Sequence, residues 1–269
     1  MGDIKISNVT KIFGSNTKRA LALLQQGFDK TAILEQTQCQ VGLNNISLDI
    51  EAGKIFVVMG LSGSGKSTLV RHVNRLIEPT SGAILFDNEN ILELGAPALR
   101  QFRMHRVSMV FQSFGLMPHR TVLQNIVYGQ RVRGISKSAA RPIGMRWIEA
   151  VGLSGYENKY PQQLSGGMKQ RVGLARALAA DTDVILMDEA FSALDPLIRA
   201  DMQDQLLQLQ QGLGKTIIFI THDLDEAIRI GSKIAILKDG QLIQVGPPAE
   251  ILGAPADDYV ARFVSRHVR

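Results

Sequence analysis

The sequence has very little cysteine and lacks long apolar runs. Its 269 residues include one cysteine, Cys39, which rules out a disulfide within the chain. A lone cysteine fits a reducing compartment, and no second cysteine stands near it to suggest a redox or metal motif, so we predict an inert thiol. The longest uninterrupted apolar stretches, such as Ile55–Met59 and Ile217–Ile220, have the length of buried strands. A membrane-spanning helix needs about 20 apolar residues.

Two further absences narrow the class of protein. The N-terminal residues Met1–Thr10 alternate apolar and polar side chains and lack the apolar core of a signal peptide. We therefore expect a soluble chain in the cytoplasm that reaches a membrane only by docking on another protein. Lys and Arg number 30 against 25 Asp and Glu, a net charge of +5. Because like charges do not cluster in long runs, this mild excess does not point to nucleic acid as a partner.

The N-terminal region has a strand pattern that a helical segment interrupts. Ile4–Val9 and residues 46–50 alternate apolar and polar side chains, as half-buried strands do. Between them, near residues 15–40, the composition favours two helices, and Asp29 is suited to cap the second, Lys30–Gln36. The pattern predicts a helical insertion between the strands of a sheet.

Strand and helix patterns alternate along the rest of the chain. Ala98–Gly152 has a mostly helical pattern, whereas Val184–Met187 and Thr216–Ile220 are apolar runs typical of buried strands. A turn signal at Asp239-Gly240 between two strand patterns predicts a hairpin. Strands that alternate with helices indicate an α/β core.

Two more helices are predicted in the C-terminal part. Asp195 is suited to cap the first, Pro196 to occupy its first position and Gly212 to end it. A short helical stretch follows the hairpin at Ala256–Val268.

A glycine-rich stretch lies between a buried strand, Ile55–Met59, and a helix pattern, Ser67–Ile77. It matches the phosphate-loop pattern G-x-x-x-x-G-K-[ST], in which the glycines let successive N–H groups point at one anion. The helix adds the positive end of its dipole, the lysine adds a charge for the β- and γ-phosphates, and the serine adds a hydroxyl for Mg²⁺. The predicted nucleotide-binding residues are Gly60, Ser62, Gly63, Ser64, Gly65, Lys66, Ser67 and Thr68.

Two carboxylates end the buried strand that starts at Val184. Asp188 is placed to hold the hydration shell of Mg²⁺, and Glu189 to polarise an attacking water as general base. Two acids after a strand are often only solvated loop residues. In a chain that also has a phosphate loop, they favour catalysis.

A second glycine cradle opens another helix. Ser165 is a natural N-cap, and Gly166 and Gly167 follow it in the first turn, where an anion can bind. One nucleotide does not need two phosphate cradles from one chain. The second cradle is therefore predicted to serve a nucleotide held by a second copy.

Together these motifs resemble the ATP-binding cassette (ABC) family of P-loop NTPases. Leu164–Gly167 resembles the ABC signature, Gln112 the Q-loop, Ser192–Asp195 the D-loop and His222 the switch histidine, while Phe13 stands where an aromatic ring stacks on adenine. The resemblance implies ATP and Mg²⁺ as ligands. It implies catalytic roles for Glu189, His222, Gln112 and Lys66. It implies that Mg²⁺ is bound by Ser67, Gln112 and Asp188. Further nucleotide contacts are implied for Phe13, Ser165, Gly166, Gly167, Gln170 and Asp195.

The family resemblance also implies the fold. We expect an α/β P-loop NTPase core with a mixed, mostly parallel sheet, an N-terminal antiparallel β subdomain and an ABC helical subdomain. The expected unit is a single nucleotide-binding domain over residues 1–269, with the core in 1–96 and 170–269 and the helical subdomain in 97–169.

Within the family, one branch is a closer match. Gly60–Pro79, Met109–Pro118, Met187–Arg199 and the helical insertion resemble the ATPase subunits of importers for quaternary amines such as glycine betaine, proline betaine and choline. Many of these subunits carry two CBS regulatory modules at the C-terminus, and we do not expect them in this chain.

The same resemblance implies the partners. They are a second copy in a head-to-tail dimer that sandwiches ATP, a transmembrane permease and a substrate-binding protein, with no nucleic acid. The permease would hold the chain at the cytoplasmic face of the inner membrane. Three apolar residues after the Q-loop either dock a coupling helix of the permease or belong to the core of the helical subdomain: Phe114, Leu116 and Met117.

Other functions stay open at this point. The chain could serve an ABC importer for another solute, such as an amino acid or trimethylamine N-oxide. A soluble ABC ATPase that acts on nucleic acid or ribosomes usually has two cassettes or a long coiled-coil insertion, and neither feature occurs here. A cassette that only binds ATP is disfavoured by the presence of Glu189 and His222.

Overall fold

The computed structural model describes residues 2–192 and 194–267. Ala193 of the predicted D-loop and Val268 of the predicted last helix lie outside these residues. The chain divides into two compact units, which are described separately. Unit 1 consists mainly of residues 95–220, and unit 2 of residues 3–52, 56–94 and the chain from Thr221 onward. The fold class is α/β, as predicted, whereas the predicted subdomain limits at residues 96 and 169 stay a prediction.

Unit 2 contains an antiparallel sheet of four strands in the order β2-β1-β4-β5. The alternation of Ile4 and Ile6 with polar residues buries these two side chains on one face, and they pair with Ile50 and Leu48. The two predicted N-terminal strands are confirmed and are longer than expected. The four strands are β1 (Ile4–Phe13), β2 (Gln40–Ile50), β4 (Ser81–Phe86) and β5 (Glu89–Asn90).

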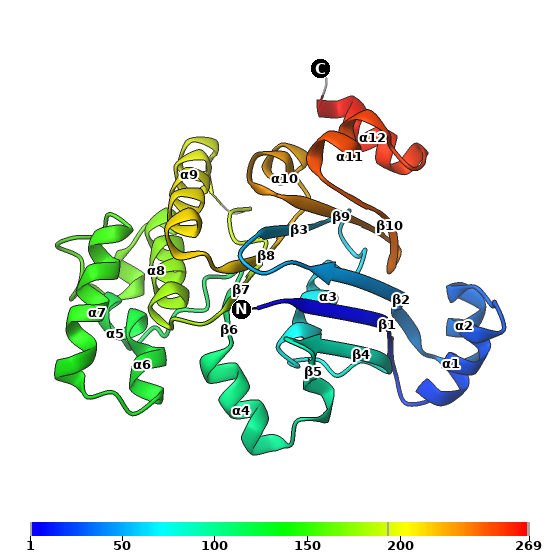
Figure 1. The fold of residues 1–269 in the computed structure, drawn as a ribbon, viewed down its shortest axis with the longest axis horizontal. Coiled ribbons are helices and arrows are strands. Elements are labelled where there is room, and N and C mark those ends of the chain that lie inside the picture. The colour runs from blue at the N-terminus through cyan, green and yellow to red at the C-terminus, as the bar shows by residue number, and fades with distance from the viewer. Residues whose placement is uncertain (1, 193, 268–269) are drawn as a thin grey trace. The chain divides into compact units, whose positions relative to one another are not determined.

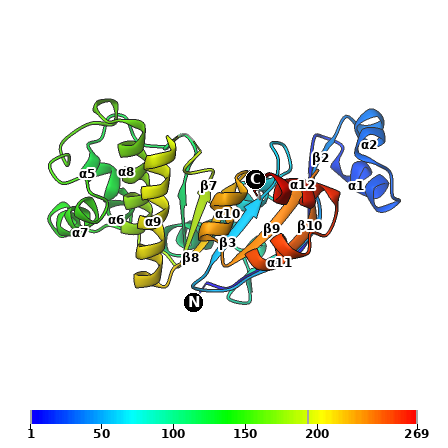
Figure 2. The ribbon, with the colours of Figure 1, turned by 90° about the horizontal axis from the view of Figure 1, so that it is seen from above.

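The predicted helical insertion connects β1 to β2. It forms α1 (Thr17–Gln25) and α2 (Lys30–Thr37), which lie together beyond one end of these strands (Figures 1 and 2). As predicted, Asp29 caps α2, with its Oδ1 accepting a hydrogen bond from the Ala32 N–H at 2.8 Å. Apolar side chains of the two helices and two strands form a small core of their own, which includes Ala20, Ile33 and the fully buried free thiol of Cys39.

A second group of strands in unit 2 includes β3 (Ile55–Met59), β9 (Lys233–Lys238) and β10 (Gln241–Gly246). β3 and β9 are parallel, and β9 and β10 form the predicted hairpin. Its turn residues Asp239 and Gly240 have φ angles of 47° and 70°, the left-handed conformation of a tight hairpin turn. The predicted C-terminal helical stretch appears as α12 (Asp258–His267), after α11 (Pro248–Gly253).

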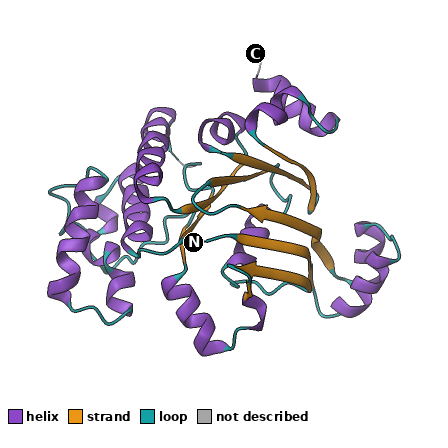
Figure 3. Ribbon diagram, viewed as in Figure 1, coloured by secondary structure: helices purple, strands orange, loops and turns teal. Residues whose placement is uncertain are grey.

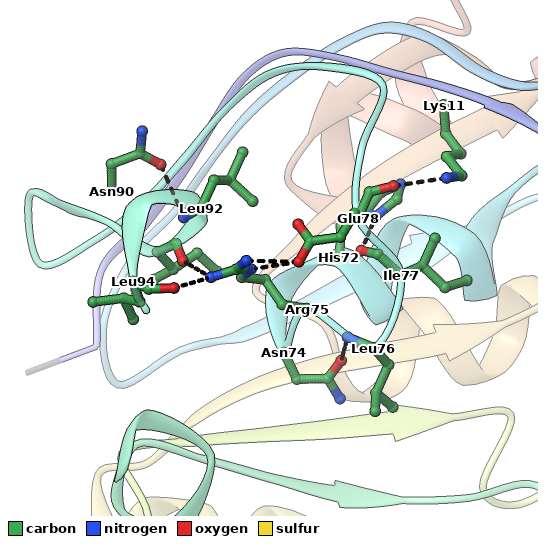
Figure 4. A network of polar contacts seen from close by, with 11 residues as sticks. Lys11, His72, Asn74, Arg75, Leu76, Ile77, Glu78, Asn90, Leu92 and Leu94 are labelled. Carbon is green, nitrogen blue, oxygen red and sulfur yellow. Dashed lines mark hydrogen bonds and ion pairs between the residues drawn. The ribbon is translucent and has the colours of Figure 1, made fainter. Parts of the chain in front are cut away.

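The helix that follows the phosphate loop, α3 (Lys66–Val73), is shorter than the predicted Ser67–Ile77. Beyond its end Arg75 has φ 51°, which breaks the helix. The Arg75 guanidinium donates to the Glu78 carboxylate at 2.6 and 3.0 Å and also to two main-chain carbonyls, those of Ile91 and Leu94 (Figure 4). This network outweighs the apolar spacing that favoured a longer helix.

A buried histidine belongs to the same network. The Nδ1 of His72 lies 2.6 Å from the Ile77 carbonyl oxygen (Figure 4). Burial lowers the pKa of His72, while the hydrogen bond to Ile77 acts in the opposite direction. The neutral ring with a proton on Nδ1 donates to this carbonyl and fixes the chain where α3 ends.

Unit 1 contains three parallel strands in the order β6-β7-β8. β7 (Val184–Asp188) and β8 (Thr216–Thr221) are fully buried, as their apolar runs predicted. β6 (Val107–Val110) lies inside a segment for which a mostly helical structure was expected, so that expectation was wrong at this strand. Only two of its four residues are buried, and its pairing with β7 decides its conformation.

The other elements of unit 1 include a group of helices that pack together without a strand among them (Figure 3). This group comprises α5 (Val122–Ile126), α6 (Tyr128–Val132), α7 (Lys137–Ala150) and α8 (Gly166–Ala179). α4 (Ala96–His105) precedes β6. Within the described residues, no helix has the length and apolar character needed to cross a membrane.

The long helix α9 (Pro196–Leu213) starts as predicted, since the Asp195 carboxylate accepts a hydrogen bond from the Ile198 N–H at 3.0 Å. The prediction that Gly212 ends it was wrong. Gly214 has the left-handed conformation, with φ 61°, and its N–H bonds back to the Gln210 carbonyl. Gly212 and Gly214 are two positions apart, and the local sequence pattern does not indicate which of them ends the helix.

Candidate functional site

The phosphate loop, Gly60–Ser67, follows β3 in unit 2 and contains two glycines at which any side chain would be strained. Gly60 has φ 151°, and a Cβ at this position would lie 2.2 Å from the Leu237 carbonyl oxygen. Gly65 has φ 99°, and its Cβ would lie 2.6 Å from the Leu43 side chain. Both the conformation and the close approach therefore require glycine.

A substitution test follows from the Gly60 geometry. We expect Gly60→Ala to lower the free energy of unfolding by more than about 3 kcal/mol, because a left-handed alanine costs about 1–2 kcal/mol and the clash with main chain adds to it. Gly63 has φ 81°, and among the described residues beyond its chain neighbours no atom lies within 4 Å of its Cβ position, so Gly63→Ala is the matched control with the conformational cost alone. Urea denaturation measures both values. Equal losses would contradict the steric role of Gly60.

Lys66 is held inside the loop. Its side chain is buried, and Nζ donates to the carbonyl oxygens of Gly60 at 2.9 Å and Leu61 at 3.1 Å. The loop also contains a buried Ser64 Oγ that has no hydrogen-bond partner among the described residues. A buried cation, the start of α3 and an unpaired hydroxyl together suit a polyphosphate. Ser67 and Thr68 are half-buried in the first turn of α3.

The acidic pair lies in unit 1. Asp188 is the buried last residue of β7, and Glu189 follows in a left-handed conformation with φ 44°. Ser192 holds this turn, because its N–H and its hydroxyl donate to the Glu189 carbonyl at 3.2 and 2.9 Å. The Gln112 side-chain amide donates to the Glu189 carboxylate at 3.1 Å. Strained residues of this kind concentrate at functional sites, and here the strain directs a predicted catalytic side chain.

The structure thus brings two predicted catalytic residues, Gln112 and Glu189, into direct contact. The sequence did not predict this contact, nor the supporting role of Ser192. Nothing in the local patterns of Gln112 and Glu189 reports a hydrogen bond over 77 positions.

The second glycine cradle begins α8 as predicted. Ser165 Oγ accepts a hydrogen bond from the Met168 N–H at 3.3 Å. Gly166 is exposed, while a Cβ on Gly167 would lie 2.9 Å from the Ile198 side chain, which would have to shift to make room for it. Gln170 is fully buried, and its amide atoms have no hydrogen-bond partner among the described residues. Its nucleotide contact stays a prediction.

Three other predicted site residues have clear positions. Asp195 is exposed and caps α9. His222 is exposed between β8 and α10 (Leu224–Ile230). Phe13 is 39% exposed at the end of β1, with the Lys11 ammonium 5.0 Å from its ring centre, so part of the aromatic surface is available for stacking.

The structure also shows contacts to the phosphate loop that sequence patterns did not indicate. The Gly240 N–H in the β9–β10 turn donates to the Ser64 carbonyl at 3.0 Å. Lys30 of the helical insertion donates to the carbonyl of Asp239 in the same turn, and burial lowers the pKa of the Lys30 ammonium. The helical insertion therefore supports the β9–β10 turn, and this turn contacts the phosphate loop.

The chain has a glycine-rich loop between a buried strand and a helix. A second buried strand, β7, ends at Asp188, and Glu189 follows it. Together these features define a P-loop nucleotide-binding protein. A protein-family model described as "ABC transporter" matches residues 43–192. The chain belongs to the ABC transporter family.

Known proteins agree with this assignment. The chain is 55% identical to the glycine betaine transport ATP-binding protein OpuAA of Bacillus subtilis, over 97% of this chain and 62% of that relative. It is 48% identical to the trimethylamine N-oxide transport system ATP-binding protein TmoW of Pelagibacter ubique, over 97% of this chain and 76% of TmoW. The dimeric structure of MJ0796, a bacterial ABC transporter cassette, matches with 31% identity and a TM-score of 0.78, over 91% and 98% of the two chains. The chain therefore spans less than two thirds of the length of OpuAA.

Proposed function

We propose that this chain is the ATP-hydrolysing subunit of an importer for quaternary-amine osmolytes such as glycine betaine, proline betaine or choline. The observation that carries the ATP assignment is the phosphate loop, with its obligate glycines and the buried Lys66 ammonium. The osmolyte assignment is supported by the 55% identity with a glycine betaine transport ATP-binding protein over nearly the whole chain.

Each predicted residue then has a chemical role. Lys66 and the loop N–H groups bind the β- and γ-phosphates, and Glu189 accepts a proton from the attacking water. Gln112 orients the Glu189 carboxylate through the hydrogen bond described above. His222 contacts the γ-phosphate, and Phe13 stacks on adenine.

The side chains of Ser67, Asp188 and Gln112 suit Mg²⁺, since all three offer oxygen ligands. When bound, Mg²⁺ neutralises phosphate charge. Asp188 is 3% exposed, so its carboxylate is already removed from bulk water and directed by the end of β7.

A second copy completes the site in this proposal. The N-terminus of α8, with Ser165, Gly166 and Gly167, presents an exposed anion cradle in unit 1. Asp195 and Gln170 are assigned to the same shared site. The dimeric structure of the related cassette supports pairing of two copies, which we propose to be head to tail.

The transport partners are a transmembrane permease and a substrate-binding protein, and the permease holds the chain at the cytoplasmic face of the inner membrane. Phe114, Leu116 and Met117 are half-buried rather than fully buried, which favours a docking role over core packing alone. Phe114 has φ 62°, so this segment adopts a tight local turn.

A second solute has support of its own. The 48% identity with a trimethylamine N-oxide transport ATP-binding protein covers the same share of this chain. Trimethylamine N-oxide and glycine betaine are both small, methylated amines. A permease and a substrate-binding protein, rather than the ATPase, distinguish them.

The decisive experiment is uptake of labelled glycine betaine at high osmolarity in cells that express the native gene or Lys66→Ala with the permease and binding protein. We expect Lys66→Ala to abolish uptake and unlabelled choline or trimethylamine N-oxide to compete according to the preference of the system. Lys18→Ala removes an exposed cation of α1 and is the matched control. Uptake that is unchanged by Lys66→Ala would overturn the osmolyte assignment, although the chain would remain an ABC family member.

A further inference from the structure

The C-terminal helix reaches the phosphate loop through one tyrosine. Tyr259, in the first turn of α12, places its hydroxyl oxygen 3.2 Å from the Leu61 nitrogen, and the Leu61 N–H donates to it. The same hydroxyl donates to the Leu237 carbonyl, also at 3.2 Å. A residue 198 positions from Leu61 therefore joins the start of the loop to the end of β9.

The hydrogen bond from the Leu61 N–H to Tyr259 helps to hold this part of the loop. The Leu61 side chain is 52% exposed, so its burial contributes little to fixing the turn. A pocket of about 610 Å³ is lined by loop residues, among them Ser62 and Ser64, and by α12 residues, among them Tyr259 and Arg262. The Tyr259 hydroxyl therefore links α12 to the loop by a direct hydrogen bond.

Leu61 is also hydrogen-bonded directly to Lys66, the predicted phosphate-binding lysine. Its carbonyl accepts a hydrogen bond from Lys66 Nζ at 3.1 Å, while its N–H donates to Tyr259. The Gly60–Leu61 peptide unit is thus held by Tyr259 at its N–H and by Lys66 at its carbonyl, and the Leu61 carbonyl accepts from Lys66 and from the Ser64 N–H at 3.2 Å. A shift of Leu61 moves a carbonyl that the ammonium of Lys66 uses.

The surroundings of Tyr259 keep its hydroxyl in place and protonated. The ring contacts Phe263 edge to face with a centroid distance of 5.1 Å, and the Lys238 ammonium lies 5.0 Å from the ring centre. Burial raises the pKa of the phenol, and the negative charges of Asp239 and Asp257 add to this effect, although the Leu61 N–H opposes it. The hydroxyl therefore remains a donor to Leu237 at neutral pH.

We propose that Tyr259 is a positioning residue for nucleotide binding, which holds Leu61 and thereby preorganises the phosphate loop. This inference rests on the proposed ATP-binding function. It assigns to α12 a direct influence on nucleotide affinity. Since the loop contacts the β-phosphate, which ATP and ADP share, the influence extends to both nucleotides.

Tyr259→Phe tests the proposal, because it removes the hydroxyl and keeps the ring with its two neighbours. Without nucleotide, we expect faster hydrogen exchange at the Leu61 amide, measured by NMR. In calorimetry we expect the Kd for ATP and for ADP to rise together by about three- to tenfold, the effect of one neutral hydrogen bond. In turnover assays we expect KM for ATP to rise by a larger factor than that by which kcat falls.

Tyr156→Phe is the matched control, since Tyr156 is an exposed tyrosine of unit 1. Thermal unfolding of the nucleotide-free variants checks that α12 remains folded. Unchanged Leu61 exchange, or unchanged affinities against a wild type that binds ATP, would overturn this inference alone. A rise in Kd for ATP without a rise for ADP would overturn it as well, because the effect would then lie at the γ-phosphate. A wild type that binds neither nucleotide would overturn the proposed function and the inference together.

Discussion

Glu189→Gln is expected to lower the ATP turnover rate by about 10²- to 10⁴-fold, or about 3–5 kcal/mol of transition-state stabilisation, while ATP still binds. The amide of glutamine has nearly the shape of the carboxylate but cannot accept the proton of the attacking water. Steady-state phosphate release and equilibrium ATP binding measure the two properties separately. Because hydrolysis is blocked after binding, the variant should also accumulate as the ATP-bound dimer.

The structure indicates that Glu189→Gln removes the negative charge and leaves the local backbone and its hydrogen bonds in place. Glu189 has φ 44°, and glutamine experiences the same backbone strain, so the turn held by Ser192 should persist. The side-chain oxygen of glutamine still accepts the hydrogen bond that Gln112 donates. Glu149→Gln, at an exposed position of α7, is the matched control for the loss of one negative charge in unit 1. Near-normal turnover in Glu189→Gln would exclude Glu189 as the base.

The sequence predicted best where local chemistry decides the structure. The apolar runs of β3, β7 and β8, the caps at Asp29, Ser165 and Asp195, and the hairpin turn were all confirmed. In each case the signal lies within a few residues, as a buried side chain, a capping oxygen or a turn that prefers φ above zero. The phosphate loop belongs to this group, because its glycines are required by conformation.

The failures have a common physical cause. α3 ends early because Arg75 contacts carbonyls of residues 91 and 94, and β6 exists because it pairs with β7, more than 70 positions later in the chain. These are tertiary contacts, and local sequence patterns do not predict them. Choosing Gly212 rather than Gly214 as the end of α9 is a smaller error with a local cause, since the two glycines are only two positions apart.

The candidate site shows the same division. Residue identities at the site could be read from motifs, whereas the residues that hold them in place could not. Ser192 supports the strained Glu189 turn, and Tyr259 and Lys30 support the phosphate loop from segments far away in the sequence. Such supporting residues become visible only when the chain is folded, and they determine how well the motif residues are preorganised.

Lys66→Ala is expected to weaken ATP binding by about 10- to 150-fold, since a hydrogen bond to a charged group contributes about 1.5–3 kcal/mol and 1.4 kcal/mol corresponds to a factor of ten. In the structure, Lys66 is 4% exposed and its ammonium is held by the Gly60 and Leu61 carbonyls. The Lys66 ammonium has therefore already lost most of its hydration before a phosphate binds. A charge that has lost its hydration in advance pays less to bind an anion.

Removal of this buried side chain also takes one donor away from each of the Gly60 and Leu61 carbonyls, so a distorted loop is a second route to a loss of affinity. Lys66→Met separates the two effects, because it keeps the aliphatic stem that fills the space and removes only the charge. We expect calorimetry to give similar losses of ATP affinity for Lys66→Ala and Lys66→Met, with Lys18→Ala equal to the wild type. If Lys66→Met bound ATP normally, the lysine would act by filling the loop rather than by contacting phosphate.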